Sequence, residues 1–210
     1  MTVLVKICGI TSVQQAQMVQ AAGADMLGLV IYEKSPRYVN VQKAAEIRSA
    51  INAPALAVAL LVNPAEALVK QVIEQVKPDY LQFHGDESPE FCHQFNYPFI
   101  RAIRMREGLD VNKEVDAYRA EGGFLFDAWS DALYGGTGHS FDWSRLPTSR
   151  DYRLILAGGL TPENVDAAVE LVKPYMVDVS GGVESAPGIK DQGKVEEFIY
   201  RAKSSNKSTY

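Results

Sequence analysis

The chain has 210 residues, of which 47% are hydrophobic and 22% are charged, and its net charge is −5. These values are ordinary for a globular protein, so they exclude a disordered or collagen-like chain, and the length fits one domain. The acidic balance argues against non-specific binding to a nucleic-acid backbone, although a single phosphate group could still be bound locally.

The cysteine count and the apolar runs bear on where the protein works. Two cysteines, Cys8 and Cys92, are too few for a disulfide scaffold and indicate a reducing compartment. The start of the chain shows no basic leader before a long apolar run, and no stretch approaches the roughly 18 apolar residues that cross a membrane. We therefore expect a cytoplasmic protein with neither a membrane nor a nucleic acid as its partner.

Short apolar runs alternate with helical patterns about eight times along the chain. Most of the runs are apolar at consecutive positions, which is typical of parallel strands that are buried on both faces. In chain order, the expected strands are residues 3–7, 26–31, 55–62, 80–83, 99–103, 123–126, 154–157 and 175–179. We expect residues 1–203 to form one domain and the polar residues 204–210 to form a C-terminal tail.

The segments between these runs have helical spacing and capping signals. In residues 65–76 the apolar side chains recur every three or four positions, which predicts an amphipathic helix. Asn63 is the expected cap of this helix, and Pro64 its first residue. For the first helix of the chain, Thr11 and Gln14 are the expected capping box.

The number of units selects the fold. Eight strand–helix units in 210 residues predict a single-domain (β/α)8 TIM barrel, with short fourth and sixth helices near residues 88–94 and 142–145. The alternative is an open doubly wound sheet, which more often has five or six strands. A barrel also predicts the place of the chemistry, because active sites lie where the strands end.

Side chains that carry chemistry gather at these strand ends. Cys8 ends the first strand, His84 follows the fourth, Asp127 follows the sixth, Asp178 lies in the eighth, and Arg37 lies in the loop after the second. A thiolate can act as a base, and a protonated carboxyl can act as an acid. The plainer interpretation is a small buried hydrophobe at position 8 and a capping residue at position 127.

Glycines follow the seventh and eighth strands at equivalent positions. Gly158 and Gly159 end one unit, and Ser180, Gly181 and Gly182 end the next. Glycines let backbone N–H groups approach an anion, so the two loops predict a cradle for a phosphate monoester. The alternative is a pair of tight turns that need positive φ angles.

Three charged or polar positions have two interpretations each. Arg37 could clamp a carboxylate or form a surface ion pair. His84 could bind substrate or satisfy a backbone carbonyl. Lys6 could place a charge near Cys8 or pair with Asp178.

Two further features concern the sixth strand and the loop after it. Phe124, Phe126 and Trp129 are apolar neighbours that could favour the neutral form of Asp127 by desolvation. The glycine-rich residues 128–138 are interpreted as a lid over the site.

No metal or cofactor site is indicated. His84, His93 and His139 do not have the spacing of a metal site. Cys92 lies in a short helical pattern and is expected to be inert.

Taken together, these segments resemble the phosphoribosylanthranilate isomerase family. The similar segments run in order along the chain and comprise residues 5–11, 28–30, 35–39, 81–87, 126–127, 135–138, 141–143, 156–165, 177–184 and 187–191. One departure is Gly181, which stands where the family usually has the second of two serines. Loss of that hydroxyl removes one phosphate contact, although the backbone N–H group remains.

The resemblance implies an Amadori rearrangement of N-(5-phosphoribosyl)anthranilate in tryptophan biosynthesis. It implies that Asp127 is the general acid, that Cys8 is the general base, that Arg37 binds the anthranilate carboxylate and that Asp178 holds a sugar hydroxyl. Substrate contact by His84 and phosphate binding by Gly158, Gly159, Ser180, Gly181 and Gly182 complete the expected site. The expected partner is a small phosphosugar, no cofactor is implied, and the chain is expected to be a monomer or a homodimer.

Three other functions are compatible with a phosphate-binding barrel. A ribulose-phosphate epimerase usually needs metal-binding histidines at several strand ends, and here only His84 lies near one; an indole-glycerol-phosphate synthase would have a longer N-terminal extension. A non-catalytic sensor of phosphate ligands would keep the glycine loops but would not need both Cys8 and Asp127.

Overall fold

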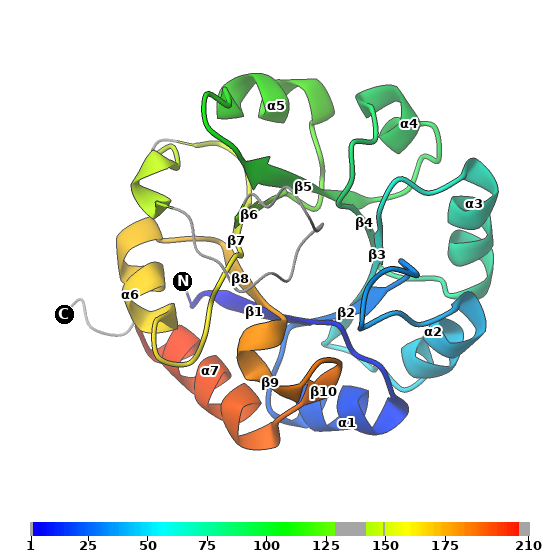
Figure 1. Ribbon diagram of the computed structural model, residues 1–210, viewed down its shortest axis with the longest axis horizontal. Helices are drawn as coiled ribbons and strands as arrows, with labels where there is room; N and C mark the ends of the chain where they lie inside the picture. Colours follow the sequence, from blue (N-terminus) through cyan, green and yellow to red (C-terminus); the bar gives the residue numbers. More distant parts are fainter. Residues whose placement is uncertain (1, 129–141, 149, 206–210) are drawn as a thin grey trace.

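The computed structural model describes residues 2–128, 142–148 and 150–205, and in this part of the chain eight parallel strands close into a barrel (Figure 1). The strands are β1 (Leu4–Cys8), β2 (Met26–Val30), β3 (Leu56–Leu61), β4 (Tyr80–Phe83), β5 (Phe99–Met105), β6 (Phe124–Ala128), β7 (Leu154–Leu156) and β8 (Met176–Val179). Each strand pairs with the next one, and β8 pairs with β1. The closed order confirms the predicted barrel and excludes the open sheet.

Helices surround the barrel on its outside (Figure 1). They are α1 (Val13–Ala21), α2 (Val41–Arg48), α3 (Glu66–Gln75), α4 (Pro89–His93), α5 (Val111–Tyr118), α6 (Val165–Val172) and α7 (Gln192–Ser204). The predicted short fourth helix is α4, and the described part of the sixth unit contains the 3-10 turn η1 (Trp143–Arg145). Beyond residue 205 the expected tail lies outside the described residues, and none of the described helices has the length and apolar character of a membrane span.

The consecutive apolar positions arise from two layers of packing. On β5, Ile100 and Ala102 face the barrel interior, whereas Phe99 and Ile103 pack against the surrounding helices. Successive side chains of a strand point to opposite faces, so a strand that is buried on both faces must be apolar at nearly every position. This packing explains why the strand boundaries could be predicted closely.

The first helix begins differently from the prediction. The cap of α1 is Ser12, whose hydroxyl accepts a hydrogen bond from the Gln15 backbone N–H at 3.2 Å. The Gln15 side chain turns back to Thr11. The expected box of Thr11 with Gln14 was therefore wrong by one residue.

The start of α3 also differs. Its cap is Ala65, which makes no side-chain capping bond, whereas Asn63 has a left-handed φ of 45°. The Asn63 side chain accepts a hydrogen bond from the Asp86 backbone N–H at 2.7 Å, and its own N–H donates to Glu87 Oε1 at 2.7 Å. Asn63 therefore fixes the loop after β4 and does not cap the helix.

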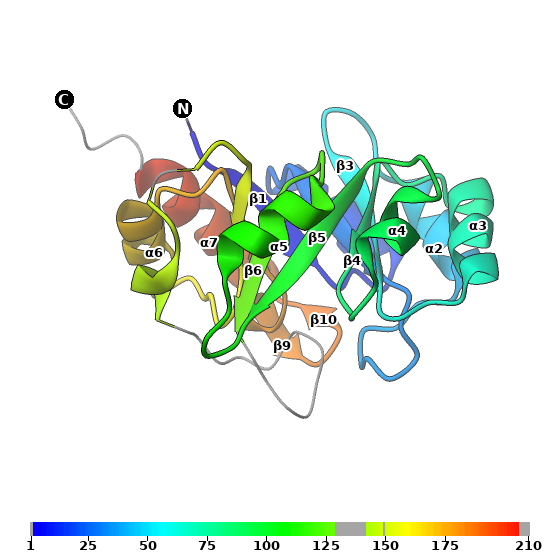
Figure 2. The same ribbon diagram turned by 90° about the horizontal axis from the view of Figure 1, so that it is seen from above.

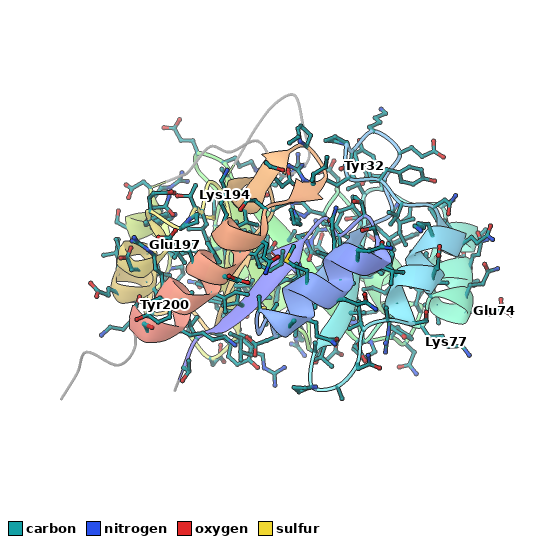
Figure 3. All side chains as sticks on the ribbon, turned by 90° about the horizontal axis from the view of Figure 1, so that it is seen from below. Tyr32, Glu74, Lys77, Lys194, Glu197 and Tyr200 are labelled. Atoms are coloured by element: carbon teal, nitrogen blue, oxygen red, sulfur yellow. The ribbon has the colours of Figure 1, made fainter. Side chains whose placement is uncertain are left out.

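A short hairpin marks the end of the barrel at which the strands finish. It comprises β9 (Glu184–Ala186) and β10 (Ile189–Lys190) and follows the 3-10 turn η2 (Gly181–Val183) at the end of β8. The side view places it at one end of the molecule (Figure 2). Tyr32, from the loop after β2, lies at the same end, and Lys77, from the loop before β4, lies at the other (Figure 3).

Candidate active site

A pocket opens at this end of the barrel. Its lining includes all ten residues that the sequence analysis selected, namely Cys8, Arg37, His84, Asp127, Gly158, Gly159, Asp178, Ser180, Gly181 and Gly182. They come from six different strand ends and the loops that follow them. The closed parallel barrel therefore brings residues that are far apart in the sequence into one pocket, at the end of the barrel where active sites lie.

Cys8 ends β1 and is buried in the pocket wall. A Cβ atom at Gly28, its register partner on β2, would lie 2.7 Å from the Cys8 sulfur, so glycine is needed beside the thiol. Burial raises the pKa of Cys8, and the positive charge of the nearby Lys6 opposes this effect without reversing it. The thiol is therefore neutral in the free protein near pH 7.

Lys6 lies two residues before Cys8 in β1, so its side chain points to the same face of the strand, and it is completely buried. Its ammonium group donates to Asp178 Oδ1 at 2.9 Å across the β1–β8 pair. Burial acts to lower the pKa of Lys6, but the negative charge of Asp178, with the hydrogen bonds to Asp178 and Cys8, outweighs it, and the pKa is raised. The structure thus combines both interpretations of Lys6, because it pairs with Asp178 and also places a cation near Cys8.

Asp127 enters the pocket from β6, and two strands separate it from β1 on the shorter way around the barrel (Figure 1). Its Oδ1 accepts a hydrogen bond from the Ala128 backbone N–H at 2.8 Å, and its Oδ2 lies 3.3 Å from His84 Nε2. Phe124 and Phe126 belong to the layer between the sheet and the helices, on the opposite face of β6. The expectation that they desolvate Asp127 was therefore wrong; its burial comes from the pocket wall.

His84 is held by a network around a buried carboxylate. Glu87 accepts hydrogen bonds from the Gly85 and Asn63 backbone N–H groups and from Arg101 at 2.7 Å. The His84 backbone N–H donates to Leu61 O at 2.9 Å. The His84 ring does not meet the backbone carbonyl that a purely structural role predicted; its two nitrogens lie near Gln82 and Asp127 instead.

Arg37 lies at the rim of the pocket in a two-pronged ion pair. Its Nε and Nη2 atoms each donate to Glu184, both at 2.8 Å, and Lys190 donates to the same carboxylate at 2.7 Å. Burial acts to raise the pKa of Glu184, but the hydrogen bonds from Arg37 and the charge of Lys190 outweigh it and lower the pKa. A Cβ atom at Gly9 would lie 2.4 Å from the Arg37 side chain, so this glycine makes room for the guanidinium.

The glycines after β7 and β8 form two facing loops. Gly158 and Gly159 have φ angles of 83° and 65°, in the left-handed region that favours glycine. Asn164, the cap of α6, donates from its side chain to Gly159 O at 2.9 Å and accepts from the Thr161 N–H at 2.8 Å. In the described part of the chain the N–H groups of Gly158 and Gly159 donate to no protein acceptor.

The second loop packs closely against the first. A Cβ atom at Gly182 would lie 2.0 Å from Leu160 O, so only glycine fits there. The Ser180 hydroxyl donates to Cys8 O at 3.0 Å, and Lys190 donates to Ser180 O at 3.0 Å. These contacts tie the end of β8 to the end of β1. Free backbone N–H groups of this kind favour the binding of an anion.

Sequence reasoning missed several residues that shape this site. Glu184 and Lys190 lie in the hairpin after β8, where no periodic pattern marks them. Gln82 could have been found from the sequence, since a polar residue inside an otherwise apolar, buried strand is unusual. Cys92 is buried, and burial raises its pKa to about 12, which agrees with an inert thiol.

Some expectations fall beyond what is described. Most of the predicted lid, residues 129–138, and Trp129 lie outside the described residues. Among the residues that the structure does describe, no group of three or more His, Cys, Asp or Glu side chains could hold a metal ion.

Comparisons with known proteins agree with this arrangement. Residues 5–201 match the family model described as N-(5'phosphoribosyl)anthranilate (PRA) isomerase. The N-(5'-phosphoribosyl)anthranilate isomerase of Pseudomonas aeruginosa PAO1 is 48% identical over 94% of this chain and 93% of its own, and that of Pseudomonas fluorescens Pf-5 is 46% identical over 97% of both.

A solved structure is similar over nearly the whole chain. The phosphoribosyl anthranilate isomerase of Thermotoga maritima superposes with a TM-score of 0.88, at 34% identity, over 96% of this chain and 99% of its own. A further phosphoribosyl anthranilate isomerase structure, in complex with reduced 1-(o-carboxyphenylamino)-1-deoxyribulose 5-phosphate, has a TM-score of 0.81 at 32% identity and the same coverage.

Proposed function

Since this chain belongs to the N-(5′-phosphoribosyl)anthranilate isomerase family, we propose that Asp127 and Cys8 are the general acid and the general base of its reaction. The chain catalyses the Amadori rearrangement of N-(5-phosphoribosyl)anthranilate to 1-(2-carboxyphenylamino)-1-deoxyribulose 5-phosphate, a step of tryptophan biosynthesis. One observation supports the two roles above all: a buried thiol from β1 and a buried carboxyl from β6 line the same pocket as the two glycine loops.

The first step needs an acid. Asp127 gives its proton to the ring oxygen of the ribose, the C1′–O bond breaks with its electron pair going to that oxygen, and the anilino nitrogen forms a C=N bond to C1′. The product is a ring-opened iminium ion, and Asp127 is left as a carboxylate. The Ala128 N–H, at 2.8 Å from Oδ1, holds the carboxyl in place for this transfer.

The second step needs a base. Cys8 removes the proton from C2′, and the electron pair of that C–H bond forms a C=C bond while the C=N electrons return to nitrogen. The enolamine that results then tautomerises to the ketone. Burial raises the pKa of Cys8, so the positive iminium group beside it and the charge of Lys6 are the features that favour the thiolate.

The two ends of the substrate carry negative charge, and the pocket offers a site for each. The glycine loops bind the phosphate through backbone N–H groups. Val30, Leu60 and Tyr32 form an apolar wall beside Cys8 that fits the anthranilate ring, and Arg37 binds its carboxylate. Glu184 occupies only Nε and one Nη2 hydrogen of Arg37, which leaves the other donors of the guanidinium for the substrate.

Two residues have supporting roles in this scheme. Asp178, held by Lys6 at 2.9 Å, accepts a hydrogen bond from a sugar hydroxyl. His84 contacts the substrate next to Asp127. The related structure in complex with reduced 1-(o-carboxyphenylamino)-1-deoxyribulose 5-phosphate supports a phosphosugar as the ligand of this pocket. A cytoplasmic location and a monomeric or homodimeric state stay predictions.

The experiment is steady-state kinetics of two variants, followed by the fluorescence change of the anthranilate group. We expect Cys8→Ala and Asp127→Asn each to lower kcat by about 10²–10⁴-fold, because each removes one proton-transfer group, and to change KM much less. Cys92→Ala is the matched control, since it removes the other buried thiol and should keep the wild-type kcat. Wild-type turnover in either site variant would refute the role assigned to that residue.

A further inference from the structure

Gln82 is a polar residue in a place where the fold calls for an apolar one. Its side chain is fully buried in the barrel interior, below the pocket, and its register partners are Leu60 on β3 and Ile100 on β5. In the described part of the chain its Oε1 atom has no hydrogen-bond partner. Burying an amide with an unpaired oxygen is costly, so its retention calls for a compensating contact.

That contact is with His84, two residues further along the same face of β4. Gln82 Nε2 lies 3.0 Å from His84 Nδ1. An amide nitrogen only donates, so Nδ1 must be the accepting, unprotonated nitrogen of a neutral ring. The ring proton of neutral His84 is therefore on Nε2. This buried nitrogen lies 3.3 Å from Asp127 Oδ2 and, among the residues that the structure describes, has no hydrogen-bond partner in the resting site.

The reversed amide would give the opposite result. With Oε1 toward the ring, His84 would carry its proton on Nδ1, and the lone pair of Nε2 would face Asp127. The orientation of one buried amide thus decides whether His84 offers a proton or a lone pair to the carboxyl group.

We propose that Gln82 is a positioning residue that holds His84 as its Nε2–H tautomer, so that His84 donates to the Asp127 carboxylate formed during turnover. This inference rests on the proposed role of Asp127 as the general acid. The proton of Asp127 moves to the ribose ring oxygen, and His84 keeps its own proton throughout.

The contact favours the transition state over the ground state. A hydrogen bond to a carboxylate is stronger than one to a neutral acid, so the His84 Nε2–H, which has no hydrogen-bond partner in the described resting site, forms its bond as Asp127 loses its proton. At that moment both carboxylate oxygens have a donor, since Oδ1 already accepts from the Ala128 N–H. A group that acts in this way should affect kcat more than KM.

The first test needs no turnover. The tautomer of each histidine is read from ¹⁵N–¹H correlation spectra of the full chain at pH 8, where a histidine with an ordinary pKa near 6.5 is neutral. The chain has three histidines, and the His84 signals are assigned by their loss in His84→Asn. We expect the Nε2–H pattern in the wild type and a protonated Nδ1 in Gln82→Glu, because a carboxylate can only accept. An Nδ1–H pattern in the wild type would overturn the proposal.

The second test is kinetic. Gln82→Met keeps the side-chain volume and removes the donor, and we expect kcat to fall about tenfold or more while KM stays within about threefold. Ile100→Met, at the register partner on β5, alters packing in the same interior layer and should keep the wild-type kcat. A Gln82→Met enzyme with wild-type kcat would also overturn the proposal. Failure of Asp127 as the acid would show instead as wild-type kcat in Asp127→Asn, and the tautomer spectra would be unaffected.

Discussion

The contact between the two glycine loops gives the sharpest test of the phosphate site. In Gly182→Ala the new Cβ would lie 2.0 Å from the carbonyl oxygen of Leu160. Carbon and oxygen atoms that are not bonded stay about 3.3 Å apart, so the loops must separate by about 1.3 Å. The φ angle of Gly182 is not positive, so the effect is purely one of space.

A displacement of that size removes one hydrogen bond to the phosphate or bends it out of line. Hydrogen bonds to a charged group contribute about 1.5–3 kcal/mol, so we expect KM to rise by about 10- to 150-fold with a smaller change in kcat. The same variant should weaken competitive inhibition by inorganic phosphate by a similar factor. Both quantities come from the fluorescence assay at several phosphate concentrations.

Two other glycine variants calibrate this result. In Gly181→Ala the new Cβ meets only the movable tip of Arg37, at 3.1 Å, so the rise in KM should be much smaller. In Gly193→Ala, near the start of α7, the nearest atom lies at 3.4 Å, an ordinary contact, and both KM and phosphate inhibition should stay at wild-type values. If Gly182→Ala bound substrate and phosphate as tightly as the wild type, the phosphate would have to lie elsewhere.

Three further predictions concern the charged groups. Lys6→Met leaves Asp178 buried without its partner, so the free energy of unfolding measured in urea should fall by about 3–5 kcal/mol; a loss below about 1 kcal/mol would show that the pair is dispensable. Because burial raises the pKa of Cys8 and only the thiolate is nucleophilic, the rate at which iodoacetamide alkylates Cys8 in the free enzyme should still climb with pH above neutrality, and a rate already constant at neutral pH would contradict this. Arg37→Met should weaken inhibition by anthranilate at least tenfold and leave inhibition by inorganic phosphate within twofold; the reverse pattern would assign Arg37 to the phosphate and not to the carboxylate.

The barrel was predictable because its rules are local. Each buried strand shows as a short apolar run. Because all strands run in the same direction, the loops that follow them lie at one end of the barrel, where active sites are found. Residues such as Cys8, Asp127 and Gly158 could therefore be assigned to one site without knowing any distance. At most of the strand ends, the expected boundary differs from the observed one by one or two residues. The observed boundary depends on backbone hydrogen bonds to the neighbouring strands, which the sequence of one strand does not show.

Features that depend on which face a side chain takes were harder to predict. Phe124 and Phe126 are close to Asp127 in sequence, but alternate residues of a strand point to opposite faces, so they pack against Tyr152 and not against the carboxyl. Asparagine is a common helix cap, yet the side chain of Asn63 accepts a hydrogen bond from the Asp86 backbone N–H in the loop after β4. In both cases a contact from a distant part of the chain overrides the local pattern.

The pair of Lys6 with Asp178 was one of the two interpretations that the sequence offered, whereas the sharing of Glu184 by Arg37 and Lys190 was beyond sequence reasoning; together these ion pairs bear on how the proposed anion sites are divided. Within the described residues, Lys6 is matched by Asp178, and Arg37 and Lys190 share Glu184. Glu184 neutralises part of the positive charge at the rim, so side-chain cations alone are poorly placed to balance a phosphate of about −1.5 to −2 charge. In the proposed phosphate site, backbone N–H groups would then supply most of the binding, because their dipoles need no counter-ion. Close packing of Gly182 against Leu160 should therefore matter more for substrate affinity than any single charged side chain.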